Sequence, residues 1–292
     1  MKFFNRLGAN WNQQRGVSLL KRAAKADPKK APGFYQAAFE RFQRALSREP
    51  DHFSAHLSWA HGMYNLARNQ TPKEQWKSYR KACEHYEQAH RLKRDEFEVL
   101  KFWALSLRGL AQNNREKDPQ LCYRQAYEKF QQAFAIQDKA NDSFYHWALT
   151  LYQQSRKLEP AHARTALKKA CEKFMQASLA HRNHPNTYND WGVALLALAN
   201  LSEDNHEKQR LLTQAHSKCL EAESIRSGFA SYNLACIASI KGNSEECRRY
   251  LEMARDHLKI PSAGHLENDP DFKNVRKSDW FKELIVQVRG QT

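Results

Sequence analysis

Small and large apolar residues follow one another along the chain at helical spacing. An alanine recurs about every 44 residues, an aromatic residue or a cysteine stands four positions after it, and a second alanine stands seven positions after it. The first alanines of the sets are Ala38, Ala82, Ala126, Ala170 and, after 45 residues, Ala215. Offsets of four and seven lie on one face of an α-helix, so each set predicts a helix with a small–large–small stripe.

Four tryptophans form a second register with the same period. Trp59, Trp103, Trp147 and Trp191 lie 44 residues apart, and each is followed by Ala or Gly. The segments around them, such as 52–68 and 97–112, are predicted to be the helices that alternate with the alanine-marked ones. A strict period of this length is typical of stacked helical hairpins, because one hairpin cannot bury its apolar face alone. We therefore expect the tryptophans to pack between hairpins, with Trp103→Ala costing roughly 3–5 kcal/mol.

This arrangement resembles the tetratricopeptide repeat (TPR) family. In AAFERFQRALSREP, the residues Ala38, Phe42, Ala45 and Pro50 match the small, aromatic, small and proline positions of the family's second helix. The last repeat, SYNLACIASIKGNSEECRRYLEMA, also keeps the family's spacing of 12 residues between its two small positions. The resemblance covers about six repeats over residues 9–261. It implies an all-α fold, a right-handed α-solenoid (TPR superhelix) of about twelve antiparallel helices.

The other repeats are longer than the family's consensus. The small residue of the first helix and the alanine of the second are 22 or 23 residues apart, an insertion of about 10. Thr71, Pro72 and Glu74 provide an N-cap, a first-turn proline and a capping box well before Ala82. Asp118-Pro119 and Ser202-Glu203 offer similar starts. We therefore predict that the second helices are lengthened and that no long loop is inserted.

The two ends depart from the repeat. Residues 1–30 form a basic N-terminal helix and the degenerate start of the first repeat, in which Gly16 takes the small position and Arg15 replaces the tryptophan. We expect Pro28, Pro32 and Gly33 to break the connection to the next helix. Residues 262–292 are predicted to be a C-terminal cap, with a capping helix after Ser278. The apolar stripe of that helix is Trp280, Phe281, Leu284, Ile285 and Val288.

Composition excludes several classes of protein. The chain has 292 residues and a net charge of +15, and its mean hydropathy of −0.84 is that of a water-soluble chain without a membrane span. No nucleophile elbow, phosphate-binding glycine loop or dinucleotide fingerprint is present, so we expect no enzyme activity and no cofactor. The six cysteines form no CxxC pair, and the two histidine pairs (His52 with His56, His181 with His184) have no third ligand. We expect reduced thiols, no metal site and a cytoplasmic protein.

The resemblance places a binding groove along the first helices of the hairpins. Counting from the small residue after each tryptophan, the positions that face the groove are rich in tyrosine and arginine, residue types that are enriched at binding hot spots. The predicted partner-binding residues are His61, Tyr64, Arg68, Lys101, Arg108, Tyr145, Tyr152, Arg156 and Asn189. They favour a protein or peptide partner that carries acidic groups together with aromatic or aliphatic ones. The Lys and Asn clamp of chaperone-binding members is absent, because Leu57, His61, Leu105, Tyr145 and Leu149 stand there.

The charge distribution leaves two questions open: the role of residues 1–30 and the class of ligand. Residues 1–30 hold eight Lys and Arg and one acid, with Phe3, Phe4, Leu7 and Trp11 on one helical face. This segment is a surface helix for an anionic membrane, an organelle-targeting segment, or a cap whose apolar face packs on the first hairpin. We favour the cap, since an exposed stripe of this kind promotes aggregation. Nucleic acid is the rival ligand class; it is disfavoured because the basic groups concentrate at one end and no RNA-reading code recurs.

Overall fold

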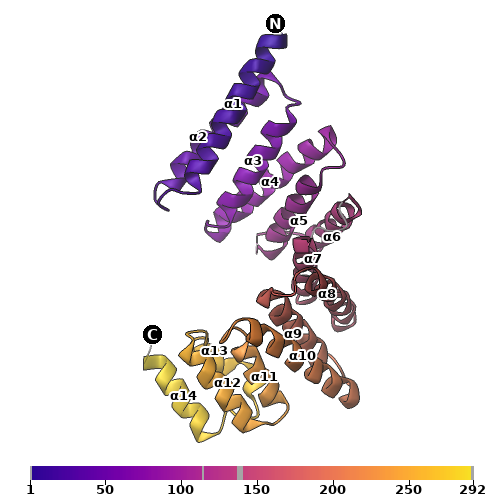
Figure 1. Ribbon diagram of the computed structural model, residues 1–292, viewed down its shortest axis with the longest axis vertical. Helices are drawn as coiled ribbons and strands as arrows, with labels where there is room; N and C mark the ends of the chain where they lie inside the picture. Colours follow the sequence, from indigo (N-terminus) through magenta and orange to yellow (C-terminus); the bar gives the residue numbers. More distant parts are fainter. Residues whose placement is uncertain (1, 114, 137–140, 291–292) are drawn as a thin grey trace. The chain divides into compact units, whose positions relative to one another are not determined.

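The computed structural model describes residues 2–113, 115–136 and 141–290. Within these ranges the regular secondary structure is helical (Figure 1). The helices are α1 Lys2–Ala23, α2 Ala31–Arg48, α3 Phe53–Ala67, α4 Pro72–Leu92, α5 Phe97–Gln112, α6 Pro119–Ile136, α7 Asn141–Ser155, α8 Pro160–Ala180, α9 Pro185–Asn200, α10 Asn205–Ile225, α11 Ser231–Ile240, α12 Ser244–Asp256, α13 Ala263–Asn268, the 3₁₀ helix η1 Pro270–Phe272, and α14 Asp279–Gly290.

The chain divides into two compact units, residues 1–143 and 144–292. In the first unit, α1 packs on α2, α3 on α4 and α5 on α6. In the second, α9 packs on α10 and α11 on α12, while η1 contacts α11 and α14 contacts α12. The fold is therefore an all-α solenoid of helical hairpins, as the sequence predicts.

The small–large–small stripe of the second helices forms the centre of each hairpin. The central aromatic residues are fully buried, namely Phe42, Tyr86, Phe130 and Phe174. The alanine four residues before each of them and the alanine three residues after it are buried as well. The small position of the facing helix receives the aromatic ring. A Cβ atom built on Gly16 in α1 would lie 2.4 Å from the ring of Phe42, so only glycine fits at this approach. Gly16 thus confirms that α1 is the first helix of a hairpin.

The second helices are long, as predicted. Helices α4, α8 and α10 have 21 residues each, whereas α12 of the last, consensus-like hairpin has 13. Thr71 stands at the N-cap of α4, but its hydroxyl donates to the Glu74 carboxylate at 3.1 Å and makes no bond to the backbone, so the predicted capping box is incomplete. The expected start at Ser202 is wrong: α10 begins three residues later, where the side chain of Asp204 accepts from the His206 amide.

Each repeat tryptophan contacts the second helix of a hairpin. Trp59 lies 6.1 Å from the ring of Phe39 in α2 and 4.2 Å from that of His85 in α4. At the position equivalent to His85, the later repeats carry a lysine whose ammonium group lies over the indole. The distances are 4.3 Å for Lys129 over Trp103, 4.2 Å for Lys173 over Trp147 and 4.4 Å for Lys218 over Trp191. A cation over an indole face adds electrostatic attraction to the apolar contact.

The N-terminal helix differs from expectation in two ways. Pro32 and Gly33 lie in the first turn of α2, where proline is tolerated because the N–H it lacks has no helical partner, and they do not break the helix. The expectation that the apolar face of this segment packs on the first hairpin is wrong. Helix α1 packs through Ala9, Asn12, Gly16 and Ala23, whereas Phe4, Leu7 and Trp11 lie on its exposed side. The side chain of Phe3 lies outside the described part of the structure.

The C-terminal elements cover the last hairpin. Phe272 of η1 is fully buried, with its ring 5.7 Å from that of Tyr232 in α11 and 5.5 Å from that of Phe281 in α14. The stripe of α14 is buried as predicted at Phe281, Leu284, Ile285 and Val288, while Trp280 is half-buried and donates its indole N–H to Ser244.

Candidate functional site

Helices α3 and α5 of the first unit present an aromatic surface with cations around it, which we call the α3–α5 face. Its centre is Phe102, a residue that the sequence analysis did not select. The rings of His61 and Tyr64 meet that of Phe102 edge to face, at centroid distances of 4.7 and 5.3 Å. Residues on one helix at a spacing of three share a side, so α3 places His61 and Tyr64 together against α5.

Lys101 adds a positive charge to this face. Its Nζ lies 5.2 Å from the centroid of the Phe102 ring and 3.7 Å from Glu98 Oε1. Burial, followed by the nearby Lys101, lowers the pKa of His61 to about 4. His61 is therefore a neutral imidazole at physiological pH, and it contributes aromatic surface but no charge.

The two predicted arginines of the first unit flank the same ring cluster. Tyr79 of α4 lies 6.0 Å from Tyr64, and its pKa is raised by burial and by Tyr64 but opposed by the positive charges of Arg108 and Arg68. Arg68 is exposed and Arg108 half-buried. The structure thus gathers five predicted residues of this unit around Phe102 and Tyr79. Together they can hold an aromatic or aliphatic group beside a carboxylate.

The equivalent surface of the second unit, on α7, α9 and α11, is a network of amides and a carboxylate. We call it the α7–α11 face. The Tyr145 hydroxyl donates to Asp190 Oδ2 at 2.8 Å, and the Asn189 amide donates to Asp190 Oδ1 at 3.1 Å. The Asn233 amide in turn donates to Asn189 Oδ1 at 2.7 Å. Burial raises the pKa of Asp190, although the bonds from Tyr145 and Asn189 oppose this.

The remaining two predicted residues lie near the end of α7, with Tyr152 in its last turn and Arg156 directly after it. Tyr152 is half-buried, and burial raises the pKa of its hydroxyl while Arg156 opposes this and Asp190 adds to it. Arg156 is exposed. The structure therefore places Tyr145, Tyr152 and Asn189 near one carboxylate, Asp190, that the sequence analysis did not select.

The overlooked residues share one position in the repeat. Phe102, Asp190 and Asn233 each stand two residues before the small residue of their helix, whereas the predicted groove residues before it stand at three. Across the repeats this position holds Ser58, Phe102, His146, Asp190 and Asn233, so its chemistry changes along the chain.

One group of side chains in the described residues has the donor set and spacing of a metal site. The ligand atoms of Cys236, Asp269 and Asp271 all lie within 4.8 Å of one another. These groups are already bonded, because Asp269 accepts from the Tyr232 hydroxyl and from the Asp271 amide. Burial also raises the pKa of the Cys236 thiol well above its usual range, which opposes the thiolate that a metal requires. The cluster is explained by the attachment of η1 to α11.

No protein-family model matches the sequence, and no curated protein matches it either. Solved structures do resemble the fold. Pseudomonas aeruginosa PilF aligns with a TM-score of 0.53 and 15% identity over 97% of this chain and 99% of its own. YrrB, described as a TPR protein with an unusual peptide-binding site, aligns with a TM-score of 0.51 and 15% identity over 85% of this chain and 97% of its own. A human IFIT1 dimer with PPP-AAAA aligns with a TM-score of 0.52 and 16% identity over 88% of this chain and 56% of its own. The chain therefore has the fold of TPR proteins.

Proposed function

We propose that this chain is a non-enzymatic TPR scaffold that binds a protein segment carrying acidic and aromatic or aliphatic side chains. The observation that carries the proposal is the α3–α5 face, where Tyr64 and Phe102 form an aromatic surface and three cations lie around it. An acidic side chain gains charge-assisted hydrogen bonds from arginine, and an aromatic one gains contact with the rings. The fold supports the same function class, since TPR arrays are chiefly protein-binding scaffolds.

The α7–α11 face would add contacts of another kind. Asn189 and Asn233 present amides that can bind the main chain of an extended segment, while Tyr152 lies in the last turn of α7 and Arg156 directly after it. The carboxylate of Asp190 disfavours an acidic side chain beside it. We therefore assign the acidic groups of the partner to the α3–α5 face and main-chain contacts to the α7–α11 face.

We also propose a cytoplasmic location. Cys219 and Cys247 are fully buried at packing positions, and burial raises the pKa of each thiol to about 12. Such thiols act as small apolar residues, which fits a reducing compartment.

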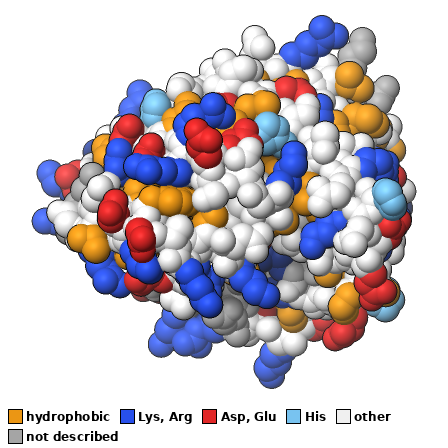
Figure 2. Space-filling model, turned by 90° about the horizontal axis from the view of Figure 1, so that it is seen from below, with side chains coloured by type: hydrophobic (Ala, Val, Ile, Leu, Met, Phe, Trp, Pro, Cys, Tyr) orange, Lys and Arg blue, Asp and Glu red, His pale blue; other side chains and the backbone are white. Residues whose placement is uncertain are grey.

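Nucleic acid ranks below a peptide as the ligand. The first unit has 26 Lys and Arg against 15 Asp and Glu, but the second has 21 against 17. On the surface drawn in Figure 2, basic, acidic and hydrophobic side chains intermingle, without the basic stripe that tracks a phosphate backbone. A titration separates the two: nucleic-acid affinity falls steeply between about 50 and 200 mM salt, whereas peptide binding through aromatic contacts changes little.

The proposal is tested by selecting peptides from a random phage-displayed library on the full chain. We expect the selected sequences to be enriched in Asp or Glu near Phe or Leu. The double variant Arg68→Gln/Arg108→Gln should bind a selected peptide at least about tenfold more weakly, because each charge-assisted bond contributes about 1.5–3 kcal/mol. Arg124→Gln is the matched control, since Arg124 is an exposed arginine on α6. Equal losses in both variants, or a selection without acidic residues, would contradict the proposal.

A further inference from the structure

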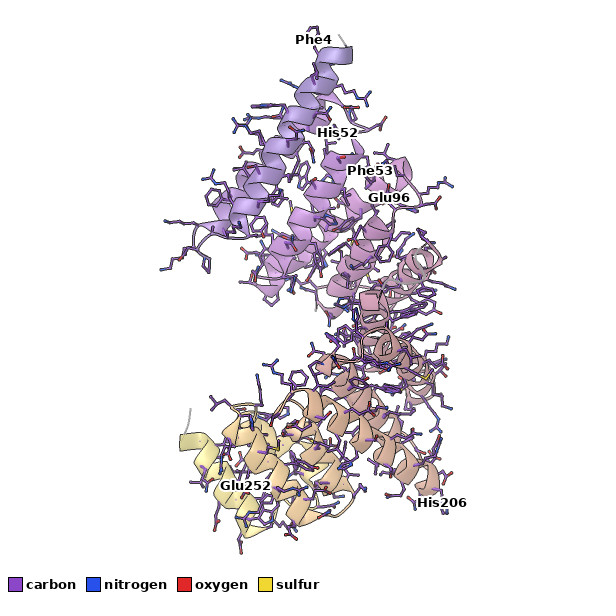
Figure 3. The ribbon with its side chains drawn as sticks, viewed as in Figure 1. Phe4, His52, Phe53, Glu96, His206 and Glu252 are labelled. Carbon is purple, nitrogen blue, oxygen red and sulfur yellow. The ribbon has the colours of Figure 1, made fainter. Side chains whose placement is uncertain are left out.

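The outer side of α1 carries an exposed apolar stripe. Phe4, Leu7 and Trp11 are spaced by three and four residues, so they share one side of the helix, and they are 75%, 50% and 49% exposed. Phe4 lies near the beginning of α1 (Figure 3). The opposite side of α1 packs on the hairpin: the Gln13 amide donates to Ser58 at 3.1 Å, and Asn10 lies 2.8 Å from the His52 ring.

The same stripe becomes basic toward the end of α1. Ser18, Arg22 and Lys25 follow Trp11 at helical spacings of seven, four and three residues. With Lys21 and Lys30 they line a hollow of about 510 Å³, which also contains Asp27. Arg22 lies over the Phe34 ring at 4.5 Å, so its guanidinium group is held at the wall of this hollow.

Trp11 joins the apolar and basic parts. The guanidinium groups of Arg15 and Arg41 lie 5.2 and 5.3 Å from the centre of its indole. Residues 1–26 contain no Asp or Glu. An apolar stripe, cations stacked on its tryptophan, and a basic hollow therefore follow one another along α1 and the turn after it.

We propose that this side of α1 is a docking surface for an anionic phospholipid bilayer. Phe4, Leu7 and Trp11 would enter the boundary between headgroups and acyl chains, and the hollow lined by Lys21, Arg22, Lys25 and Lys30 would hold lipid phosphates. Apolar burial and charge attraction together give stable membrane binding, whereas either one alone is marginal. A single-stranded nucleic acid fits less well, because Leu7 offers no ring for a base and arginines flank the indole of Trp11.

The test is flotation of the full chain with vesicles of phosphatidylcholine alone or with about 30% phosphatidylserine. We expect binding to the anionic vesicles only, with release as salt rises, because surface charge is screened within about a Debye length. Phe4→Ser/Leu7→Ser and Lys21→Glu/Lys25→Glu should each lower the vesicle-bound fraction at least about tenfold. These side chains are exposed, so thermal melting should show both variants folded.

Matched controls lie in the second unit. Val286 is 67% exposed on α14, and Lys273 and Lys277 are exposed cations. Val286→Ser and Lys273→Glu/Lys277→Glu should leave vesicle binding unchanged. Peptide binding at the α3–α5 face should survive every α1 variant, so the two proposals fail separately.

Three results would overturn the membrane proposal. The first is no binding of the intact chain to anionic vesicles. The second is equal loss in the α1 and control variants. The third is evidence that the stripe binds another occupant. This would be so if sedimentation without lipid showed a dimer that Phe4→Ser/Leu7→Ser converts to a monomer. It would also be so if the intact chain bound a single-stranded oligonucleotide more tightly than vesicles and this variant lost that binding.

Discussion

The two units use one repeat framework and carry different chemistry on it. Both stack a lysine on the repeat tryptophan, as Lys129 does on Trp103 in the first unit and Lys173 on Trp147 in the second. At the position two residues before the small residue, however, the first unit has Phe102 and the second has Asp190. The net charge is +11 in the first unit and +4 in the second. Packing positions thus repeat because the hairpins must stack, while the positions between them differ in chemistry from one unit to the other.

The largest expected effect tests the shared framework. Trp147 is 4% exposed, whereas Trp103 is half-buried. Trp147→Ala should lower the free energy of unfolding by roughly 3–5 kcal/mol, and Trp103→Ala should cost roughly 3 kcal/mol, near the lower end, because it leaves a smaller cavity. Urea denaturation followed by circular dichroism measures both. A cost below about 1 kcal/mol for either would mean that the indole contributes little to packing.

The second prediction concerns acid stability, which should differ between the units. The folded-state pKa of His61 is about 4 and that of His85 about 3, against about 6.5 in the unfolded chain, and both residues lie in the first unit. Between pH 6.5 and pH 4 the unfolded state binds more protons, so stability is fully present above pH 6.5 and falls as pH drops toward 4. The contribution of His61 is about 3 kcal/mol.

Replacing the imidazole with a ring that cannot be protonated isolates this effect. His61→Phe keeps the contact with Phe102 and should reduce the loss of stability between pH 7 and pH 4. Hydrogen exchange with mass spectrometry at pH 5 should show earlier opening of α3 and α5 than of α9 and α10. Unchanged pH dependence in the variant would show that His61 is not the titrating group.

A smaller effect is expected at the small position of α9. The small positions of α3, α5 and α7 hold Ala60, Ala104 and Ala148, but that of α9 holds Gly192, where an added Cβ would lie 2.4 Å from Cys219 Sγ. Gly192→Ala should therefore destabilise the second unit by about 1–3 kcal/mol through overpacking. Adding Cys219→Ala should recover part of this loss, because it removes the nearest atom. Thermal melting of the two variants decides the question, and a neutral Gly192→Ala would show that the helices can separate freely.

The smallest difference concerns the helix caps. The Asn243 side chain accepts from the Glu246 amide at 3.2 Å at the start of α12, whereas Thr71 makes no such backbone bond at α4. Asn243→Ala should cost about 1 kcal/mol and Thr71→Ala about half of that or less. Equal costs in urea denaturation would mean that Thr71 caps its helix in solution.

The sequence alone determined the helices and their order. The period by itself predicts the small–large–small stripe around Phe42, the small position at Gly16 and the lengthened second helices. The choice of groove residues, with Tyr64, Lys101 and Tyr145 among them, stays a prediction.

Only the tertiary structure decided which stripes are buried and which side chains meet. Helix α1 has two sides that can pack, one small and one aromatic, and the sequence analysis chose the aromatic one. The hairpin selected Ala9 and Gly16, because close approach of two helix axes requires small residues, and Phe4 and Trp11 were left exposed. Asp190 meets Tyr145 and Asn233 meets Asn189 across 45 and 44 residues, respectively. Such contacts depend on how neighbouring hairpins stack, which local periodicity does not encode.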